Sequence, residues 1–443
     1  MVDSQFWFIS LSLSSVLLLL VTLYALDFDL LSPVIATQSS LTIASILCTI
    51  MVKQWQLPMH GSTVLILISA QIVMTLGSLY VAHCLNDRTI VKASISTKNM
   101  SDVYIPMYRQ GILWILLAVI VGLAGHEMYT LAEKAGNKNG ILGIASSIRP
   151  YIMAESSTIK LSRWMAYYQI LVQQITYLSI FAFIQRSVFK AWRWSNLCYL
   201  IPLLFFFPFV YLTTGRILII TLVIFIFTII GHALYRKYEG YAYAKKLLTT
   251  AGISFLSFFL LFIIVGTLFG KGISSNSSAL EILAHYAGIS LSAFDVILQY
   301  QLADSTLIGQ TIFIGPYSNL NTLGFNLPKP SIFLFFTYFY NIDTNVYTSL
   351  MRYYHDFSLV GMYLFALLIL MVYTILYYAC RQRNSIPMIL AYATFVYPLY
   401  LFYVDDRIFM DFFGTQIIYI VVLQFILIKF GHLHKIDIKD IQR

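Results

Sequence analysis

Long uninterrupted runs of apolar residues recur from one end of the sequence to the other. A run of about 20 such residues is long enough to cross the roughly 30 Å of hydrocarbon in a bilayer as an α-helix. The runs are continuous rather than alternating, which excludes a transmembrane β-barrel. Charged residues make up only 11% of the 443 residues, against about 25% in a soluble domain. We therefore expect an all-α polytopic membrane protein.

The apolar runs predict about eleven membrane-spanning helices, within a range of about 10–12. They are placed at 5–26, 33–52, 63–84, 106–125, 164–185, 197–212, 216–234, 249–269, 356–379, 386–403 and 414–431. No basic residue precedes the first run and no small-residue cleavage pattern follows it, so we expect a retained helix rather than a signal peptide. Residues 1–443 are thus interpreted as a single integral membrane domain, in which 270–355 form one large loop.

Lysine and arginine are concentrated in alternate connections between the predicted spans. Cytoplasmic connections are enriched in these residues, so the pattern sets the orientation of the chain. The basic connections contain Arg88, Lys92, Lys98, Arg109, Arg186, Lys190, Arg193, Arg236, Lys237, Lys245, Lys246, Arg381, Arg383, Lys429, Lys435, Lys439 and Arg443. The net charge of +9 is therefore a topology signal, and without one dense basic patch it does not predict nucleic-acid binding.

Histidine and cysteine give no pattern typical of a metal site or a disulfide framework. Cys48, Cys84, Cys198 and Cys380 lie within or at the ends of apolar runs, without the CxxC spacing, and are expected to be small apolar fillers. His432 and His434 have no partner ligands nearby in the sequence. We expect neither a metal nor another cofactor.

The external face then carries the turn between the second and third spans, residues 126–163, the turn 213–215, the loop 270–355 and the turn 404–413. The turn Thr213-Thr214-Gly215-Arg216 leads directly into an apolar helix. A guanidinium at the positive end of a helix dipole, beside hydroxyls and a glycine, suits a diphosphate or a carboxylate, because it donates paired hydrogen bonds and keeps its charge. The alternative is an arginine that extends to phospholipid headgroups.

The densest polar cluster lies in 332–361, at the start of the predicted span 356–379. It combines donors, acceptors, a cation and two proton carriers within twelve residues, and histidine titrates in the range that general acid–base catalysis needs. The members singled out here are Asn345, Tyr347, Thr348, Arg352, Tyr353, Tyr354, His355 and Asp356. Upstream, Ile332 to Tyr340 is too short to span and is expected to form an interfacial or re-entrant helix, and Ile289 to Gln301 a short amphipathic helix.

Two further external segments contain candidate cations. Residues 126–163 mix both signs of charge, and a solvated loop is the favoured interpretation there; the alternative is that Arg163, which borders an apolar run, faces inward. The turn Tyr403-Val404-Asp405-Asp406-Arg407 places two carboxylates beside an arginine. A local salt-bridged turn is the favoured interpretation there, and Arg407 is kept as an additional candidate.

Three segments give the chain a resemblance to a known family. They are Thr213 to Arg216 before an apolar helix; the run from Tyr286-Ala287-Gly288 to Ala293-Phe294-Asp295; and Asn345-Val346-Tyr347-Thr348 with Tyr354-His355-Asp356-Phe357-Ser358. Ser358 stands where the pattern has glycine. In these segments, within residues 210–380, the chain resembles the Wzy-type polymerases of bacterial O-antigen and capsule repeat units. The N-terminal half is similar only in hydropathy.

The resemblance implies a function in the bacterial inner membrane, with a metal-independent active site facing the periplasm, as in C-type glycosyltransferases. A growing glycan on undecaprenyl diphosphate would be transferred to a new lipid-linked repeat unit, and a chain-length regulator protein would be a further partner. Arg216, then Arg352, would hold the diphosphate, with Arg163 and Arg407 as additional cations. His355 or Asp356 would act as base, with His285 as a fallback.

Binding roles follow from the same resemblance. Thr214 and Gly215 would assist at the diphosphate, and Tyr286, Asn345, Tyr347, Thr348, Tyr353 and Tyr354 would bind sugar, the tyrosines 347, 353 and 354 by stacking. Two alternative functions stay open. One is an O-antigen ligase-like transferase of the same architecture. The other is a polysaccharide transporter or flippase, which the uncharged middle of the spans and the absence of related halves argue against.

Overall fold

The computed structural model describes residues 2–86, 103–153, 161–189, 193–213, 215, 217–238, 240–268, 278–300, 308–327, 337–340, 342–383, 385–412 and 414–431. The chain divides into two compact units. Unit 1 is Met1–Lys92, Ile273–Arg383 and Phe395–Ile418, and unit 2 is Ala93–Gly272, Asn384–Thr394 and Tyr419–Arg443. Hydropathy alone does not signal this division, because two of its boundaries fall inside apolar helices, after Thr394 in α14 and after Ile418 in α17.

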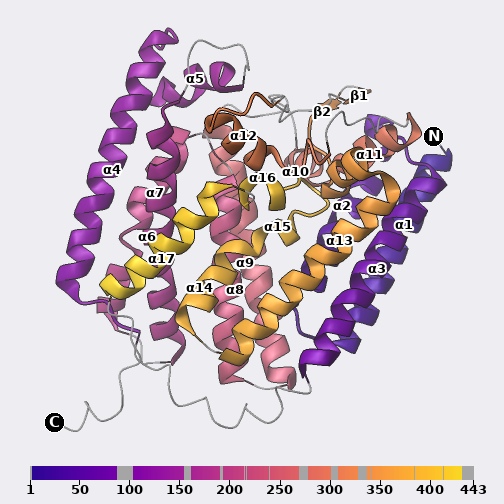
Figure 1. The fold of residues 1–443 in the computed structure, drawn as a ribbon, viewed down its shortest axis with the longest axis horizontal. Helices are drawn as coiled ribbons and strands as arrows, with labels where there is room; N and C mark the ends of the chain where they lie inside the picture. Colours follow the sequence, from indigo (N-terminus) through magenta and orange to yellow (C-terminus); the bar gives the residue numbers. More distant parts are fainter. Residues whose placement is uncertain are drawn as a thin grey trace. The chain divides into compact units, whose positions relative to one another are not determined.

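Unit 1 is built around α2, which packs against helices from both halves of the sequence (Figure 1). Its neighbours in the unit are α1, α3, α10, α11, α13 and α15. The elements of unit 1 are α1 (Val2–Ala25), α2 (Pro33–Trp55), α3 (Gly61–Asn86), α10 (Ala279–Ala287), α11 (Ser290–Gln299), α12 (Ile314–Thr322), β1 (Thr337–Phe339), β2 (Ile342–Thr344), α13 (Ser349–Arg383), α15 (Tyr397–Tyr400) and α16 (Ile408–Phe412).

Small polar side chains explain how α2 is enclosed. Thr37, Ser40 and Ser45 are buried on it, and small residues of this kind let membrane helices approach closely and hydrogen-bond across the contact. Gly288, between α10 and α11, also permits a close approach to α2, because a Cβ at this position would lie 3.2 Å from the Cβ of Leu47. The two short helices therefore rest directly on α2.

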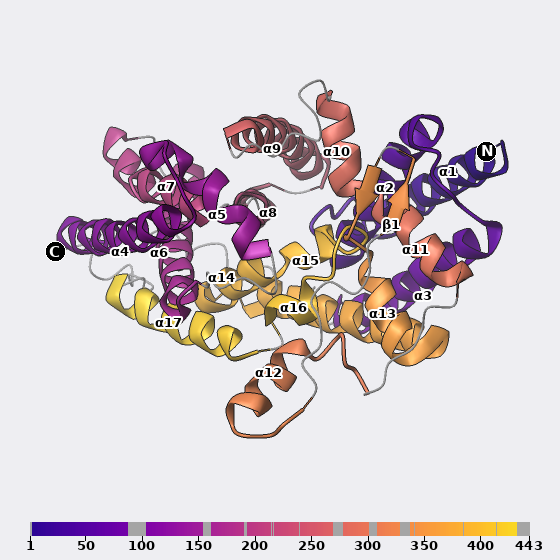
Figure 2. The same cartoon turned by 90° about the horizontal axis from the view of Figure 1, so that it is seen from above.

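The two ends of unit 1 differ in chemistry. At one end, the turn before α2 meets the end of α13, where the carboxylate of Asp29 accepts hydrogen bonds from Tyr377 Oη at 2.8 Å and Arg381 Nη1 at 2.5 Å. At the other end lie the start of α1, the α2–α3 turn, α10, α11 and the hairpin of β1 and β2 (Figures 1 and 2). Helix α13 connects the two ends, from Ser349 to Arg383.

Unit 2 is a bundle of helices centred on α6. It contains α4 (Met107–Lys134), η1 (Gly140–Gly143), α5 (Ile144–Met153), α6 (Arg163–Phe189), η2 (Trp194–Leu200), α7 (Leu203–Thr213), α8 (Ile217–Lys237), α9 (Gly240–Leu268), α14 (Ile386–Phe395) and α17 (Thr415–Gly431). Tyr177 of α6 stacks on Phe225 of α8, with ring centroids 4.0 Å apart. Gln424 of α17 donates to Gln174 of α6 at 2.8 Å, so a polar contact is enclosed within the apolar bundle.

The prediction of an all-α multi-pass membrane protein is confirmed. In the described ranges, eight helices are long and apolar enough to cross a membrane, and all but Leu280–Gln299 coincide with predicted spans. Four predicted spans fall outside that set of eight helices. Span 164–185 lies on α6, 386–403 on α14 and α15, 414–431 on α17, and the described part of 249–269 on α9. The count of eleven and the periplasmic loop stay predictions.

The segment predicted as the large loop contains more regular structure than its glycines and prolines suggested. Helix α10 opens with a capping box, in which Ser278 and Glu281 exchange side-chain-to-backbone hydrogen bonds. The short helix expected after Ile289 is present as α11. The helix expected at 332–340 is wrong in its described part, since Thr337–Phe339 pairs antiparallel with Ile342–Thr344, and β-branched and aromatic residues favour a strand there.

Candidate functional site

The predicted polar cluster lies in the first turns of α13, which begins at Ser349, earlier than the predicted span. The side chain of Asp356 is fully buried. Its Oδ2 accepts hydrogen bonds from the backbone N–H groups of Thr311 and Ile312, each at 2.9 Å, and its Oδ1 lies 3.1 Å from His355 Nδ1. Because these contacts occupy both carboxylate oxygens, Asp356 fastens residues 311–312 to α13.

Arg352 lies one turn before Asp356 and is 6% exposed. Its Nη1 donates to the carbonyl oxygen of Thr311 at 3.4 Å, and the Thr311 hydroxyl donates to the Arg352 carbonyl at 3.5 Å. The guanidinium is therefore held by the same short segment that Asp356 fastens. A buried arginine in a membrane protein is costly unless a negative charge compensates it. A buried carboxylate is therefore expected near Arg352.

The buried carboxylate whose pKa responds to the Arg352 charge is Asp406. It is fully buried in the turn between α15 and α16, and its Oδ1 accepts from the backbone N–H of Ile408 at 3.1 Å. Burial raises the pKa of Asp406 to about 7, and the Arg352 charge opposes that rise. Its Oδ2 has no hydrogen-bond partner among the residues described. A buried, under-satisfied carboxylate beside a cation is typical of functional sites.

Sequence reasoning did not select Asp406. The turn was interpreted as a salt bridge around Arg407, and in the structure Arg407 Nη2 does lie 2.7 Å from Asp405 and its Nη1 3.8 Å from Asp411. Asp405 also raises the pKa of Arg407. The charge of Arg407 is thus already balanced by two carboxylates. The available signal was a second aspartate, next to Asp405, for which the sequence offered no separate partner.

The structure places most of the predicted sugar-binding residues in the interior of unit 1. The Tyr347 hydroxyl lies 2.6 Å from the Thr337 hydroxyl, which ties the β hairpin to the entry of α13. Thr348 is fully buried, and Asn345 is half-buried. These contacts give Tyr347 and Thr348 a role in positioning the segment before Arg352.

The aromatic residues differ in how far they fit a stacking role. Tyr353 is fully buried, with its ring centroid 5.7 Å from that of Phe409 and 6.3 Å from that of Phe402. It packs as a core residue, and stacking of Tyr353 on a sugar is not supported. Tyr354 packs edge-on against Phe294. Tyr286 is half-buried beside His285, whose Nε2 lies 3.0 Å from the Asp343 carbonyl oxygen.

The remaining predicted site residues belong to unit 2. Thr214 and Arg216 lie outside the described residues. Gly215 is half-buried between the end of α7 and the start of α8. Arg163 opens α6 and is exposed, which agrees with the favoured solvated interpretation and not with the inward-facing alternative.

Ser358 interrupts α13 directly after the cluster. Its backbone has φ 58° and ψ −168°, a region that essentially only glycine occupies without strain. Three residues later, a Cβ on Gly361 would lie 2.0 Å from the Cβ of Phe357, so only glycine fits there. The kink separates the polar first turns of α13 from its apolar remainder and thereby sets where the Arg352 cluster lies.

Ser358→Gly is expected to stabilise the protein by about 1 kcal/mol, because glycine adopts this conformation without the side-chain clash. The midpoint of thermal unfolding in detergent measures the effect. Ser10→Gly, inside the regular helix α1, is the matched control and should destabilise by about 0.5–1 kcal/mol. A lower midpoint for Ser358→Gly would show that the serine side chain contributes more than the strain costs.

Comparisons with known proteins identify no relative: no protein-family description, no curated protein and no solved structure matches this chain. A functional assignment therefore rests on the residues themselves and on the geometry around Arg352.

Proposed function

We propose that this protein is a polymerase of lipid-linked oligosaccharide repeat units in a bacterial inner membrane. It transfers a growing glycan from undecaprenyl diphosphate to the sugar end of a new lipid-linked unit, with its active site on the periplasmic side. The observation that carries the proposal is the buried Arg352, which lies with His355 and Asp356 in the first turns of a long apolar helix. Its charge also favours ionisation of the buried Asp406. The reaction releases a diphosphate, and a fixed cation in a water-poor site stabilises the charge that develops on it.

The backbone at Ser358 gives independent support. The resembled pattern has glycine at this position, and the observed φ of 58° is the one that glycine favours. The glycine of the pattern and the φ angle at position 358 thus agree, although this chain has serine there. The resemblance then supplies the substrate class, which the geometry around Arg352 does not specify.

The buried contacts refine the roles proposed for the cluster. Asp356 holds backbone N–H groups through one oxygen and His355 through the other, so we propose it as a structural support rather than as the base. Arg352 is proposed as a cation for the diphosphate, and Arg216 of unit 2 as the first candidate for the same chemistry. No metal takes part in this proposal.

Deleting the gene in its host separates the proposed function from its alternatives. A polymerase deletion is expected to leave single repeat units on the cell surface in place of a ladder of chain lengths on a polysaccharide gel. A ligase-like enzyme would leave long chains on undecaprenyl diphosphate. A flippase would leave unpolymerised lipid-linked units on the cytoplasmic side. An unchanged ladder would contradict all three functions.

A further inference from the structure

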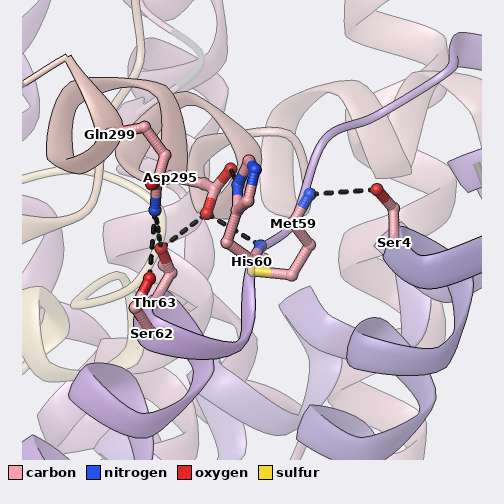
Figure 3. A network of polar contacts seen from close by, with 7 residues as sticks. All are labelled: Ser4, Met59, His60, Ser62, Thr63, Asp295 and Gln299. Carbon is pink, nitrogen blue, oxygen red and sulfur yellow. Dashed lines mark hydrogen bonds and ion pairs between the residues drawn. The ribbon is translucent and has the colours of Figure 1, made fainter.

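A second titratable pair, which the proposed function does not use, lies at the end of unit 1 where α2 turns into α3. The carboxylate of Asp295 on α11 is fully buried, and the side chain of His60 is 56% exposed. The Asp295 Oδ2 to His60 Nδ1 distance is 2.8 Å (Figure 3). His60 lies between the apolar helices α2 and α3, outside both, so its ring is at the membrane surface.

Asp295 is held from several sides. Its Oδ1 accepts from the His60 backbone N–H at 3.0 Å and from the Thr63 hydroxyl at 2.5 Å. Gln299, one turn further along α11, donates to the Ser62 hydroxyl at 3.1 Å (Figure 3). These contacts fix the carboxylate at the N-terminus of α3, where a negative charge is also favoured by the helix dipole.

The imidazole is not required for that capping role. The backbone N–H and the Thr63 hydroxyl already bind Oδ1, and the ring occupies Oδ2 alone. An ionised carboxylate only accepts hydrogen bonds, so His60 Nδ1 is the donor and, in the neutral ring, Nε2 carries the free electron pair. The ring is thus held in one tautomer, with Nδ1 on the buried carboxylate and the basic Nε2 on the other side of a ring that is 56% exposed, the arrangement that general-base catalysis uses.

The pair is connected to the Arg352 cluster through α11. Phe294, next to Asp295, packs edge-on against Tyr354, next to His355, with ring centroids 6.4 Å apart. Ser290 on the same helix donates to the carbonyl oxygen of Tyr403 at 2.6 Å, three residues before Asp406. A single ten-residue helix therefore positions both polar groups of this end of unit 1.

We infer that His60 is the base of the transfer reaction, oriented by Asp295; this inference rests on the proposed function. The acceptor sugar hydroxyl forms a bond to the anomeric carbon of the donor glycan. The bond from that carbon to the phosphate oxygen breaks, and its electron pair passes to the diphosphate. The hydroxyl proton passes to His60 Nε2. His355 and Asp356, the bases predicted from sequence, have buried side chains that are engaged with each other.

The test uses purified full-length protein in lipid nanodiscs with lipid-linked repeat units and follows polymer length and diphosphate release. His60→Asn retains a donor near the position of Nδ1 and removes the basic nitrogen. It is expected to lower the polymerisation rate at least about 100-fold with unchanged KM, and imidazole added to His60→Ala should restore part of the rate. Asp295→Asn should lower kcat and leave KM unchanged. His83→Asn, at the opposite end of α3 and exposed, is the matched control and should match the wild type.

The outcomes separate this inference from the proposed function. If the wild type makes polymer and folded His60→Asn makes it equally fast, the inference is overturned and the proposed function stands. If the wild type makes no polymer, both fall. Should the variants not fold, carbethoxylation of wild-type His60, followed by peptide mass spectrometry, must reduce activity in proportion to the fraction modified. Full activity with His60 modified would overturn the inference.

Discussion

Arg352→Gln is expected to abolish polymer formation and to destabilise unit 1 in a pH-dependent way. The guanidinium is 6% exposed, and it opposes the burial that raises the pKa of Asp406 to about 7. Below pH 7 Asp406 is largely protonated, so the variant loses only the arginine's own contacts, about 1–3 kcal/mol. As the pH rises above 7, Asp406 ionises in the wild type, where the Arg352 charge stabilises the carboxylate. In the variant no arginine compensates that charge, so the variant continues to lose stability. The loss should then grow toward the ~3–5 kcal/mol typical of a broken buried pair.

The effect is measured by the unfolding midpoints of both proteins from about pH 5.5 to about pH 8.5, a range that includes this pKa. The double variant Arg352→Gln/Asp406→Asn removes the titrating group and should lose the pH dependence. Arg352→Lys retains the charge without the planar fork, so it should recover stability more than activity. A destabilisation by Arg352→Gln that is the same at both ends of the pH range would contradict the coupling to Asp406.

Hydropathy predicted the helices well because each apolar run has one stable state in a membrane. It predicted the start of α13 less well. The predicted span begins at 356, close to the kink at Ser358, whereas the helix itself begins at Ser349. The polar first turns remain helical because Asp356 and Arg352 bind residues 311–312, a contact between segments more than forty positions apart that no local pattern encodes.

The candidate site was predictable in composition but not in geometry. Arg352, His355 and Asp356 stood out because titratable residues are rare in this chain. Which of them is available depends on long-range neighbours, and burial of His355 and Asp356 against 311–312 leaves them poorly placed as bases. Asp406 and the His60–Asp295 pair come from turns whose partners lie on other helices. Only the fold brings such partners together.

Arg216→Ala is the second change expected to have a large effect, an at least 100- to 1,000-fold loss of polymerisation on the order of one lost oxyanion donor. Arg216 directly precedes Ile217, the first residue of α8, and follows Thr213, whose hydroxyl donates back to the Phe209 carbonyl at 3.0 Å. The Thr213 hydroxyl is thus engaged within α7, and the sequence places Arg216 directly before α8, whose positive dipole end also favours an anion.

The matched control is Arg236→Ala, in the last turn of the same helix. It removes the same charge at the opposite end of α8 and should leave the ladder of chain lengths unchanged, provided that both variants reach wild-type levels in the membrane. Arg216→Lys tests the geometry of the donor, because a lysine supplies charge without paired hydrogen bonds. If Arg216 only contacts phospholipid headgroups, Arg216→Lys and Arg216→Ala should both give a normal ladder. If only Arg216→Ala leaves single repeat units, the reaction needs a positive charge at this turn but not paired hydrogen bonds. If both variants leave single repeat units, the arginine binds the diphosphate through paired hydrogen bonds.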